Sequence, residues 1–153
     1  MGRRAERAIN TTRFARQFAS DDATSDDLDI LLTLVDCQIT YRSRYLVGPL
    51  LAPVRDLVVL DPYNPRSVAF QVSALNDHIA SLPALKENGL MERPQRLAVA
   101  LRSSLVTGEA SEIHTKSLFA LEQDLLTLAD SIGLQYFPHG ASASRPEKLT
   151  GLA

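Results

Sequence analysis

The stretch Asp61-Pro62-Tyr63-Asn64-Pro65-Arg66-Ser67-Val68-Ala69-Phe70 decides the fold of this chain, because it joins a turn to the start of a helix. Its two prolines prevent a helix from running through the turn, since neither ring nitrogen can donate a hydrogen bond. Asn64 is typical of a helix N-cap, and Pro65 suits the first helical position, where no N–H is needed. We therefore expect a helix over residues 65 to about 81.

Apolar residues after the turn recur with helical spacing. One stripe is formed by Val68, Val72, Leu75, Ile79 and Leu82. The same spacing predicts further helices over residues 3–19, 25–45 (capped by Ser25), 54–60, 94–107 and 109–136. No stretch alternates with the period of two that a strand requires. The sequence therefore predicts an all-α fold, a helical bundle of about five long helices and one short one.

The chain length and composition are those of one globular domain. Its 153 residues are 45% apolar and 22% charged, with a net charge of −2. We assign residues 1–140 to the bundle and expect the small, polar residues 141–153 to form a disordered tail. The near-neutral charge gives no general attraction to nucleic acid or to an anionic membrane, so neither is expected as a partner.

The sequence favours a cytoplasmic location. The single cysteine, Cys37, excludes an internal disulfide and fits a reducing compartment. No apolar run approaches the roughly 20 residues of a membrane helix. The charged N-terminus has no apolar segment behind it, so no signal peptide is predicted.

No catalytic, metal or cofactor motif is present. The three histidines, His78, His114 and His139, lack metal-ligand spacing, and one cysteine cannot form a thiolate site. Cys37 is expected to be a packing residue within a helix. No glycine-rich phosphate loop, nucleophile elbow or dinucleotide fingerprint occurs, so we expect no catalytic residue, metal or cofactor.

Arginines and tyrosines near predicted helix ends are the remaining candidates for a binding site. Together with two residues of the motifs described below, the ligand-binding candidates are Arg3, Glu6, Arg7, Tyr41, Arg44, Tyr63, Asn64 and Arg66. If the bundle brings them together, they form a pocket for phosphate or carboxylate, with Arg66 beside a helix N-terminus. The alternative is an internal ion-pair network in which Glu6 and the arginines tie three helices together and the tyrosines cover them.

Three segments, residues 2–8, 41–45 and 60–71, resemble the alpha-E domain, a bacterial all-helical domain named for its Glu-Arg motif, here Glu6-Arg7. The resemblance runs from Gly2 to about Phe137 and covers what looks like the C-terminal half of the domain, without the N-terminal half and its first Glu-Arg copy. The helical pattern also begins almost at Met1. We therefore expect the chain to be a piece of a longer protein.

The resemblance implies a context rather than a reaction. Alpha-E domains are typically fused to, or encoded beside, circularly permuted ATP-grasp ligase-like proteins and transglutaminase-like peptidases, which places them in peptide or amide-bond formation or modification. Their own activity is not established, so no catalytic role is carried over. The positions that match the family motifs are Glu6, Arg7, Tyr41, Arg44, Asn64 and Arg66.

The leading hypothesis is a helical accessory module that partners an ATP-grasp-type ligase, by docking or by holding an anionic peptide or acyl-phosphate end. The first alternative is an enzyme that uses Glu6 as acid or base, which requires a buried carboxylate. The second is a structural module whose uncovered apolar face packs on the missing N-terminal half or forms a homodimer.

Overall fold

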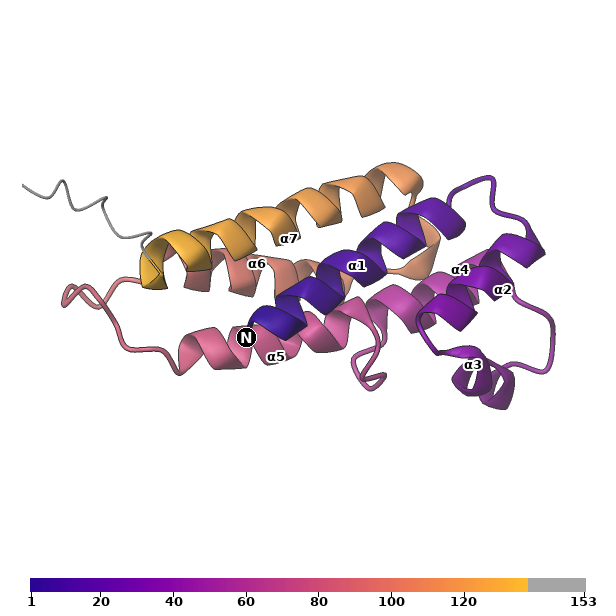
Figure 1. Ribbon diagram of the computed structural model, residues 1–153, viewed down its shortest axis with the longest axis horizontal. Coiled ribbons are helices and arrows are strands. Elements are labelled where there is room, and N and C mark those ends of the chain that lie inside the picture. Colours follow the sequence, from indigo (N-terminus) through magenta and orange to yellow (C-terminus); the bar gives the residue numbers. More distant parts are fainter. Residues whose placement is uncertain (138–153) are drawn as a thin grey trace, which may run out of the picture.

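The computed structural model describes residues 1–137, and every regular element in that range is a helix (Figure 1). The four long helices are α1 (Gly2–Phe18), α5 (Val68–Ala80), α6 (Arg93–Thr107) and α7 (Thr115–Tyr136). They run alternately in opposite directions, and α1 and α6 each pack against both α5 and α7. The four helices thus form a closed ring, and the predicted all-α bundle is confirmed.

Shorter helices close the right-hand end of the bundle in Figure 1. They are α2 (Ser25–Leu34), α3 (Gln38–Arg44) and α4 (Leu51–Arg55). α4 continues without a break into η1 (Asp56–Leu60), a π-helical turn in which the Asp61 N–H donates to the Asp56 carbonyl at 2.9 Å. The short helix predicted over residues 54–60 is therefore present but begins at Leu51. A 3₁₀ turn, η2 (Ala110–Glu112), precedes α7.

The prediction of one helix over residues 25–45 is wrong, because the helix ends at Leu34. Asp36 adopts the left-handed conformation with φ 55°. The Cys37 N–H donates to the Leu32 carbonyl at 2.8 Å and the Asp36 N–H to the Thr33 carbonyl at 3.1 Å, which is the Schellman arrangement. Cys37 consequently precedes α3, buried, instead of lying within a helix. This helix end could not be predicted from the sequence, because aspartate occupies the position that glycine usually takes in this motif.

The two expected N-caps are displaced. Thr24, not Ser25, caps α2, because its side chain and that of Asp27 form a reciprocal capping box. Ser67, not Asn64, caps α5, accepting the Phe70 N–H at 3.0 Å. The helix expected from Pro65 thus begins at Val68.

The core is built from the apolar stripes that the sequence shows. On α5 the members Val68, Val72, Leu75 and Ile79 are buried, whereas Leu82 lies past the helix end and is half-buried. α1 buries mainly small residues, among them Ala8, Thr12 and Ala15. Small side chains allow the two neighbouring helices, α5 and α7, to approach α1 closely.

A buried arginine joins three distant segments at one end of the bundle. Arg55 is only 4% exposed. Its guanidinium donates to the Ala19 carbonyl at 2.9 and 2.7 Å, to the Ile113 carbonyl, and to the Asp21 carboxylate at 3.0 Å. Asp21 also accepts the Thr115 N–H at 3.2 Å. The end of α1, the helix α4 and the start of α7 are therefore held by one side chain.

A second ion-pair cluster joins α1 to α7. Both carboxylate oxygens of the buried Glu122 accept, one from Arg13 and one from Arg16, each at 2.8 Å. The hydrogen bond from Arg13 and then that from Arg16 lower the pKa of Glu122, against the opposing effect of its desolvation. The basic face of the first helix is thus largely structural in its second half.

The expected disordered tail, residues 141–153, and the predicted domain boundary at 140 lie outside the described residues, as does His139. Within residues 1–137, no helix is both long enough and apolar enough to cross a lipid bilayer.

Replacing Arg55 with methionine should lower the free energy of unfolding by about 2–4 kcal/mol, because the Ala19 and Ile113 carbonyls lose a buried donor. Urea unfolding followed by circular dichroism measures this loss. Arg102→Met, at an exposed arginine of α6, is the control and should change stability by less than about 0.5 kcal/mol. Equal effects of the two substitutions would contradict the role of Arg55.

Stability should fall with acid partly through Asp21. Its hydrogen bond from Arg55, together with those from Thr115 and His114, lowers its pKa from 3.8 to about 2 despite some desolvation. A carboxyl group with a depressed folded-state pKa stabilises the fold above its unfolded pKa, and this stabilisation is lost as pH falls from about 4 through 2. Urea titrations at several pH values should show a smaller acid-induced loss in Asp21→Asn than in wild type. Asp22→Asn, at the exposed neighbour, should retain the wild-type loss, and an unchanged loss in Asp21→Asn would contradict the prediction.

Candidate functional site

A cleft of about 430 Å³ lies between α1, the end of α2 and the turn before α5. It is lined by Arg7, Asn10, Thr11, Phe14, Leu34, Val35, Pro65, Arg66 and Gln71. The four α1 residues among them, Arg7, Asn10, Thr11 and Phe14, occupy positions i, i+3, i+4 and i+7 and so share one helix face. We call this the Arg7–Arg66 cleft, because two of the predicted arginines, 59 positions apart in the sequence, meet at it.

Charged and amide groups form the polar wall of the cleft. The Arg66 guanidinium lies 2.7 Å from the Asp36 carboxylate, and both side chains are more than half exposed. Gln71, 1% exposed, donates to the Pro65 carbonyl at 2.6 Å and accepts from Arg4 at 3.4 Å. Within residues 1–137, Arg7 has no carboxylate within ion-pair distance. Among the described residues, the cleft therefore presents one guanidinium without an ion-pair partner and one neutralised guanidinium.

Two of the other predicted residues have structural roles. The Tyr41 hydroxyl, in a buried side chain, donates to the Gly48 carbonyl at 3.3 Å and accepts the Leu50 N–H at 3.0 Å, which fixes the loop after α3. The amide of the buried Asn64 donates to the Leu57 carbonyl at 2.9 Å and accepts the Arg66 N–H at 3.1 Å. Asn64 thus shapes the turn that carries Arg66.

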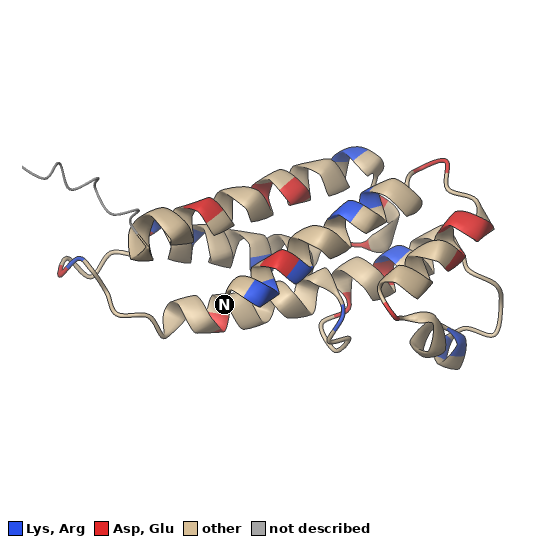
Figure 2. Ribbon diagram, in the orientation of Figure 1, with Lys and Arg blue, Asp and Glu red and all other residues tan. Residues whose placement is uncertain are grey.

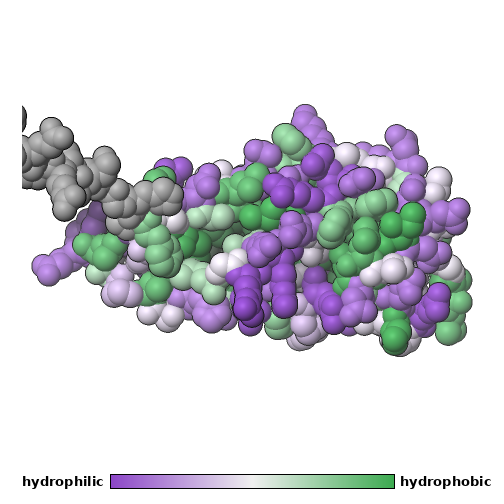
Figure 3. Space-filling view, viewed as in Figure 1, coloured by the Kyte–Doolittle hydropathy of each residue, from purple (hydrophilic) through white to green (hydrophobic). Residues whose placement is uncertain are grey.

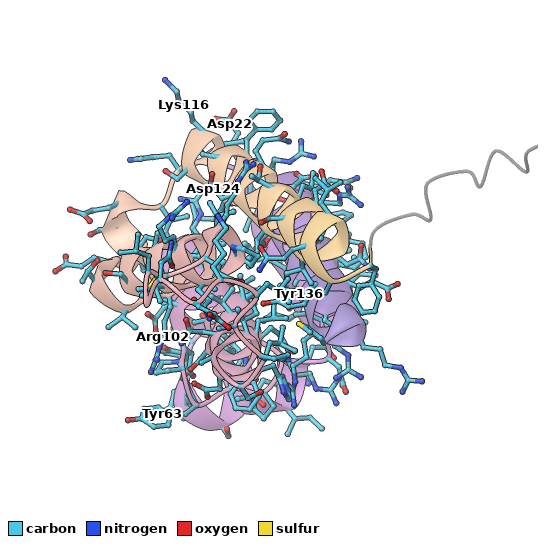
Figure 4. All side chains as sticks on the ribbon, turned by 90° about the vertical axis from the view of Figure 1, so that its left-hand side faces the viewer. Asp22, Tyr63, Arg102, Lys116, Asp124 and Tyr136 are labelled. Carbon is cyan, nitrogen blue, oxygen red and sulfur yellow. The ribbon has the colours of Figure 1, made fainter. Side chains whose placement is uncertain are left out.

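Arg44 and Tyr63 lie outside the cleft. Arg44 forms an ion pair with the buried carboxylate of Asp61, and this contact raises the pKa of Arg44 further above its ordinary value. Tyr63 is 85% exposed and points away from the bundle in Figure 4. The expected single cluster of arginines and tyrosines is therefore divided.

Arg3 and Glu6 are exposed on the first turns of α1, where Figure 2 shows basic segments around one acidic segment. Neither residue lines the cleft. Glu6 is adjacent to Arg7 and faces another side of the helix, whereas Arg3 lies one turn before Arg7, where the lining of the cleft begins. Glu6 has no cation within ion-pair distance in the described chain. It is not part of the internal network considered from the sequence; Asp36, Asp61 and Glu122 pair with arginines instead.

Sequence reasoning missed Asn10 and Gln71 in the cleft, and Arg55 elsewhere. The spacing of Arg7, Asn10 and Phe14 on one helix face was a usable signal for the first. No sequence signal marked Gln71, because it lies between the apolar positions of α5. Its burial depends on the conformation of the turn, whose Pro65 carbonyl accepts its hydrogen bond. Arg55 lies in an apolar run. Its burial could not be predicted from the sequence, because a buried charge requires acceptors, and here these are carbonyls of distant segments.

The described residues contain no group of three or more metal-ligating side chains. His78 and His114 are exposed, and His114 lies 3.3 Å from Asp21. Cys37 is buried, and this burial raises the pKa of its thiol. The candidate site is thus a cleft lined by arginine and amide groups.

The fold and the cleft together define an all-helical domain with an arginine-bearing surface cleft. The chain belongs to the Alpha-E family, described as a predicted alpha-helical domain with a conserved ER motif, whose model matches residues 1–137. The sequence contains two Glu-Arg pairs, Glu6-Arg7 and Glu92-Arg93. The first places an arginine at the cleft, whereas in the second the buried Glu92 caps α6 and accepts the Leu85 and Lys86 N–H groups.

Relatives of the chain occur in mycobacteria. It is 26% identical over 136 residues to uncharacterized proteins of Mycobacterium tuberculosis and Mycobacterium bovis, in alignments that cover 86% of this chain and 15% of each relative. The chain thus spans about a seventh of the length of these relatives. No solved structure matches the chain significantly.

Proposed function

We propose that this chain is a helical accessory module that holds the anionic end of a ligand in the Arg7–Arg66 cleft. The presence of two arginines in the lining of one cleft, one from α1 and one from the turn before α5, carries this proposal. Guanidinium groups bind carboxylate and phosphate oxygens through paired hydrogen bonds, which a lysine cannot reproduce. The start of α5 next to Arg66 adds the positive end of a helix dipole.

The rest of the cleft favours a ligand with an amide-containing body. Asn10 and Gln71 offer amide groups, whereas Phe14, Leu34 and Val35 offer apolar surface beside them. A peptide carboxylate or an acyl phosphate combines an anionic end with such a body. This ligand class agrees with peptide or amide-bond formation, which the resemblance to alpha-E domains implies.

We place the module in a cytoplasmic system with an ATP-grasp-type ligase. This placement rests on the resemblance, since such domains are typically fused to or encoded beside ligase-like proteins of that kind. In this role the module partners the ligase or the N-terminal half of its own domain and supplies binding rather than chemistry. Catalysis by Glu6 has less support, because its carboxylate is exposed and a general acid or base needs a desolvated position.

The cleft can be tested with inorganic phosphate, ATP and a short glutamate peptide in thermal-shift and calorimetric titrations. A probe at a hundredfold its Kd stabilises the fold by about 2.7 kcal/mol, or roughly 5–10 °C in Tm. Arg7→Ala should weaken binding about tenfold or more, because a charge-assisted hydrogen bond is lost. Arg3→Ala removes an exposed arginine one turn away that does not line the cleft, and it should bind like wild type.

Asp36→Asn gives the opposite change in the same titrations. It removes the carboxylate that neutralises Arg66, and asparagine tolerates the left-handed backbone at this position. Anion affinity should therefore rise. Equal affinities in wild type, Arg7→Ala and Asp36→Asn would contradict the proposal, as would the absence of binding to all three probes.

A second candidate is assembly through the end of the bundle that carries α2 and α3. Exposed apolar side chains gather on these helices and the loop that follows, and Figure 3 shows hydrophobic surface at this right-hand end. They are Ile30, Leu34, Ile39, Leu46, Val47 and Leu50. A gathering of this kind marks a surface that a second copy or the N-terminal half of the domain covers.

Light scattering over a range of concentrations tests assembly with a second copy. The wild-type chain should approach twice its monomer mass, and Leu46→Asp should remain monomeric because a charge enters the contact. Leu90→Asp, at an exposed leucine in the loop before α6, should behave like wild type. A wild-type chain that stays monomeric at high concentration would rule out the homodimer.

A further inference from the structure

A second hollow, of about 300 Å³, lies where α6 ends and α7 begins. Its apolar floor comes from the end of η1, from α6 and from α7, through Leu60, Leu105, Leu118 and Leu121. Gly108 also lines the groove, in a tight position where a Cβ would lie 3.1 Å from the Ser104 carbonyl and 3.4 Å from Leu60. We call this hollow the α6–α7 groove; it shares no residue with the Arg7–Arg66 cleft.

Carboxylates surround the apolar floor. Glu109, Glu112 and Asp124 line the groove and are exposed, and among residues 1–137 no lysine or arginine lines it. In the described part of the chain, none of the three carboxylates has a cation within ion-pair distance. Figure 4 shows Asp124 on the upper side of the bundle, opposite Tyr63, with Lys116 above it and Arg102 lower down. The lining of the groove is therefore acidic.

The end of α6 adds to this negative character. α6 ends at Thr107 without a basic residue in its last turn, and its C-cap, Gly108, is part of the groove. The C-terminus of a helix carries a partial negative charge and favours cations. Apolar surface, three carboxylates without an ion-pair partner among residues 1–137, and a helix C-terminus thus favour the same kind of occupant.

We propose that the α6–α7 groove docks a basic segment of a partner protein, in which one or two apolar side chains are flanked by lysine or arginine. The apolar side chains cover the leucine floor, and the cations meet Glu109, Glu112 and Asp124. This inference does not depend on the ligand in the Arg7–Arg66 cleft, because the two surfaces are separate.

The probe is a fluorescein-labelled amphipathic peptide of leucine and lysine, compared with a peptide in which glutamate replaces lysine. Fluorescence anisotropy with the full chain should show binding of the basic peptide that weakens with salt, and little binding of the acidic one.

Asp124→Lys should lower the affinity for the basic peptide roughly fivefold or more. Asp130→Lys makes the same charge change on the same helix outside the groove and should have a much smaller effect. Glu112→Lys provides a second variant at the rim, and circular dichroism verifies that all three variants fold.

Three results would overturn the proposal. The first is that the basic peptide fails to bind. The second is that Asp124→Lys and Asp130→Lys lower the affinity for this peptide equally, which would indicate only general charge attraction. In the third result, the chain self-associates without peptide and Asp124→Lys abolishes that association, so that a second copy rather than a basic partner occupies the groove.

Discussion

The buried guanidinium of Arg55 is the interaction on which the arrangement of the bundle depends. Its donors are used by backbone carbonyls after α1 and before α7 and by Asp21, so three segments distant in the sequence converge on one side chain. Only arginine offers enough donors in a planar fork for this geometry. The described chain leaves no buried side-chain nitrogen or oxygen without a hydrogen-bond partner. The Arg55 charge is thus buried among backbone carbonyl and carboxylate acceptors that satisfy it. These hydrogen bonds hold α1, α4 and α7 together at one end of the bundle.

This constraint leaves separate surfaces for separate tasks. The second half of α1 is tied to α7 through Glu122, which pairs with Arg13 and Arg16. In the first half, Arg7 lines a cleft and has no ion-pair partner among the described residues. The groove at the α6–α7 junction carries the opposite charge and is formed by other helices. A small domain with a net charge near zero can therefore present a local cationic site and a local anionic one, and its average composition conceals both.

The sequence predicted what depends on periodicity and missed what depends on tertiary contacts. The stripe from Val68 to Ile79 identified α5 and its buried face, because apolar spacing reports a helix directly. The helix end near Asp36 was not predicted, because aspartate adopts there the left-handed conformation that usually marks a glycine. In the site, Arg7 and Arg66 were identified by charge and position. Their association with Asn10 and Gln71 depends on how the turn packs on α1, and no local pattern records that packing.

The π-helical turn between α4 and α5 lets this segment carry one extra residue. A π-turn contains one more residue than an α-helical turn, so it adds a residue to the helix without rotating the residues that follow. If one residue were deleted between Asp56 and Leu60, the helix could continue as ordinary α-helix, and Asp61 would still leave it on the side of Arg44. The turn that carries Arg66 would keep its direction. In this family member the segment before the cleft therefore accommodates a change of one residue in length while the cleft keeps its orientation.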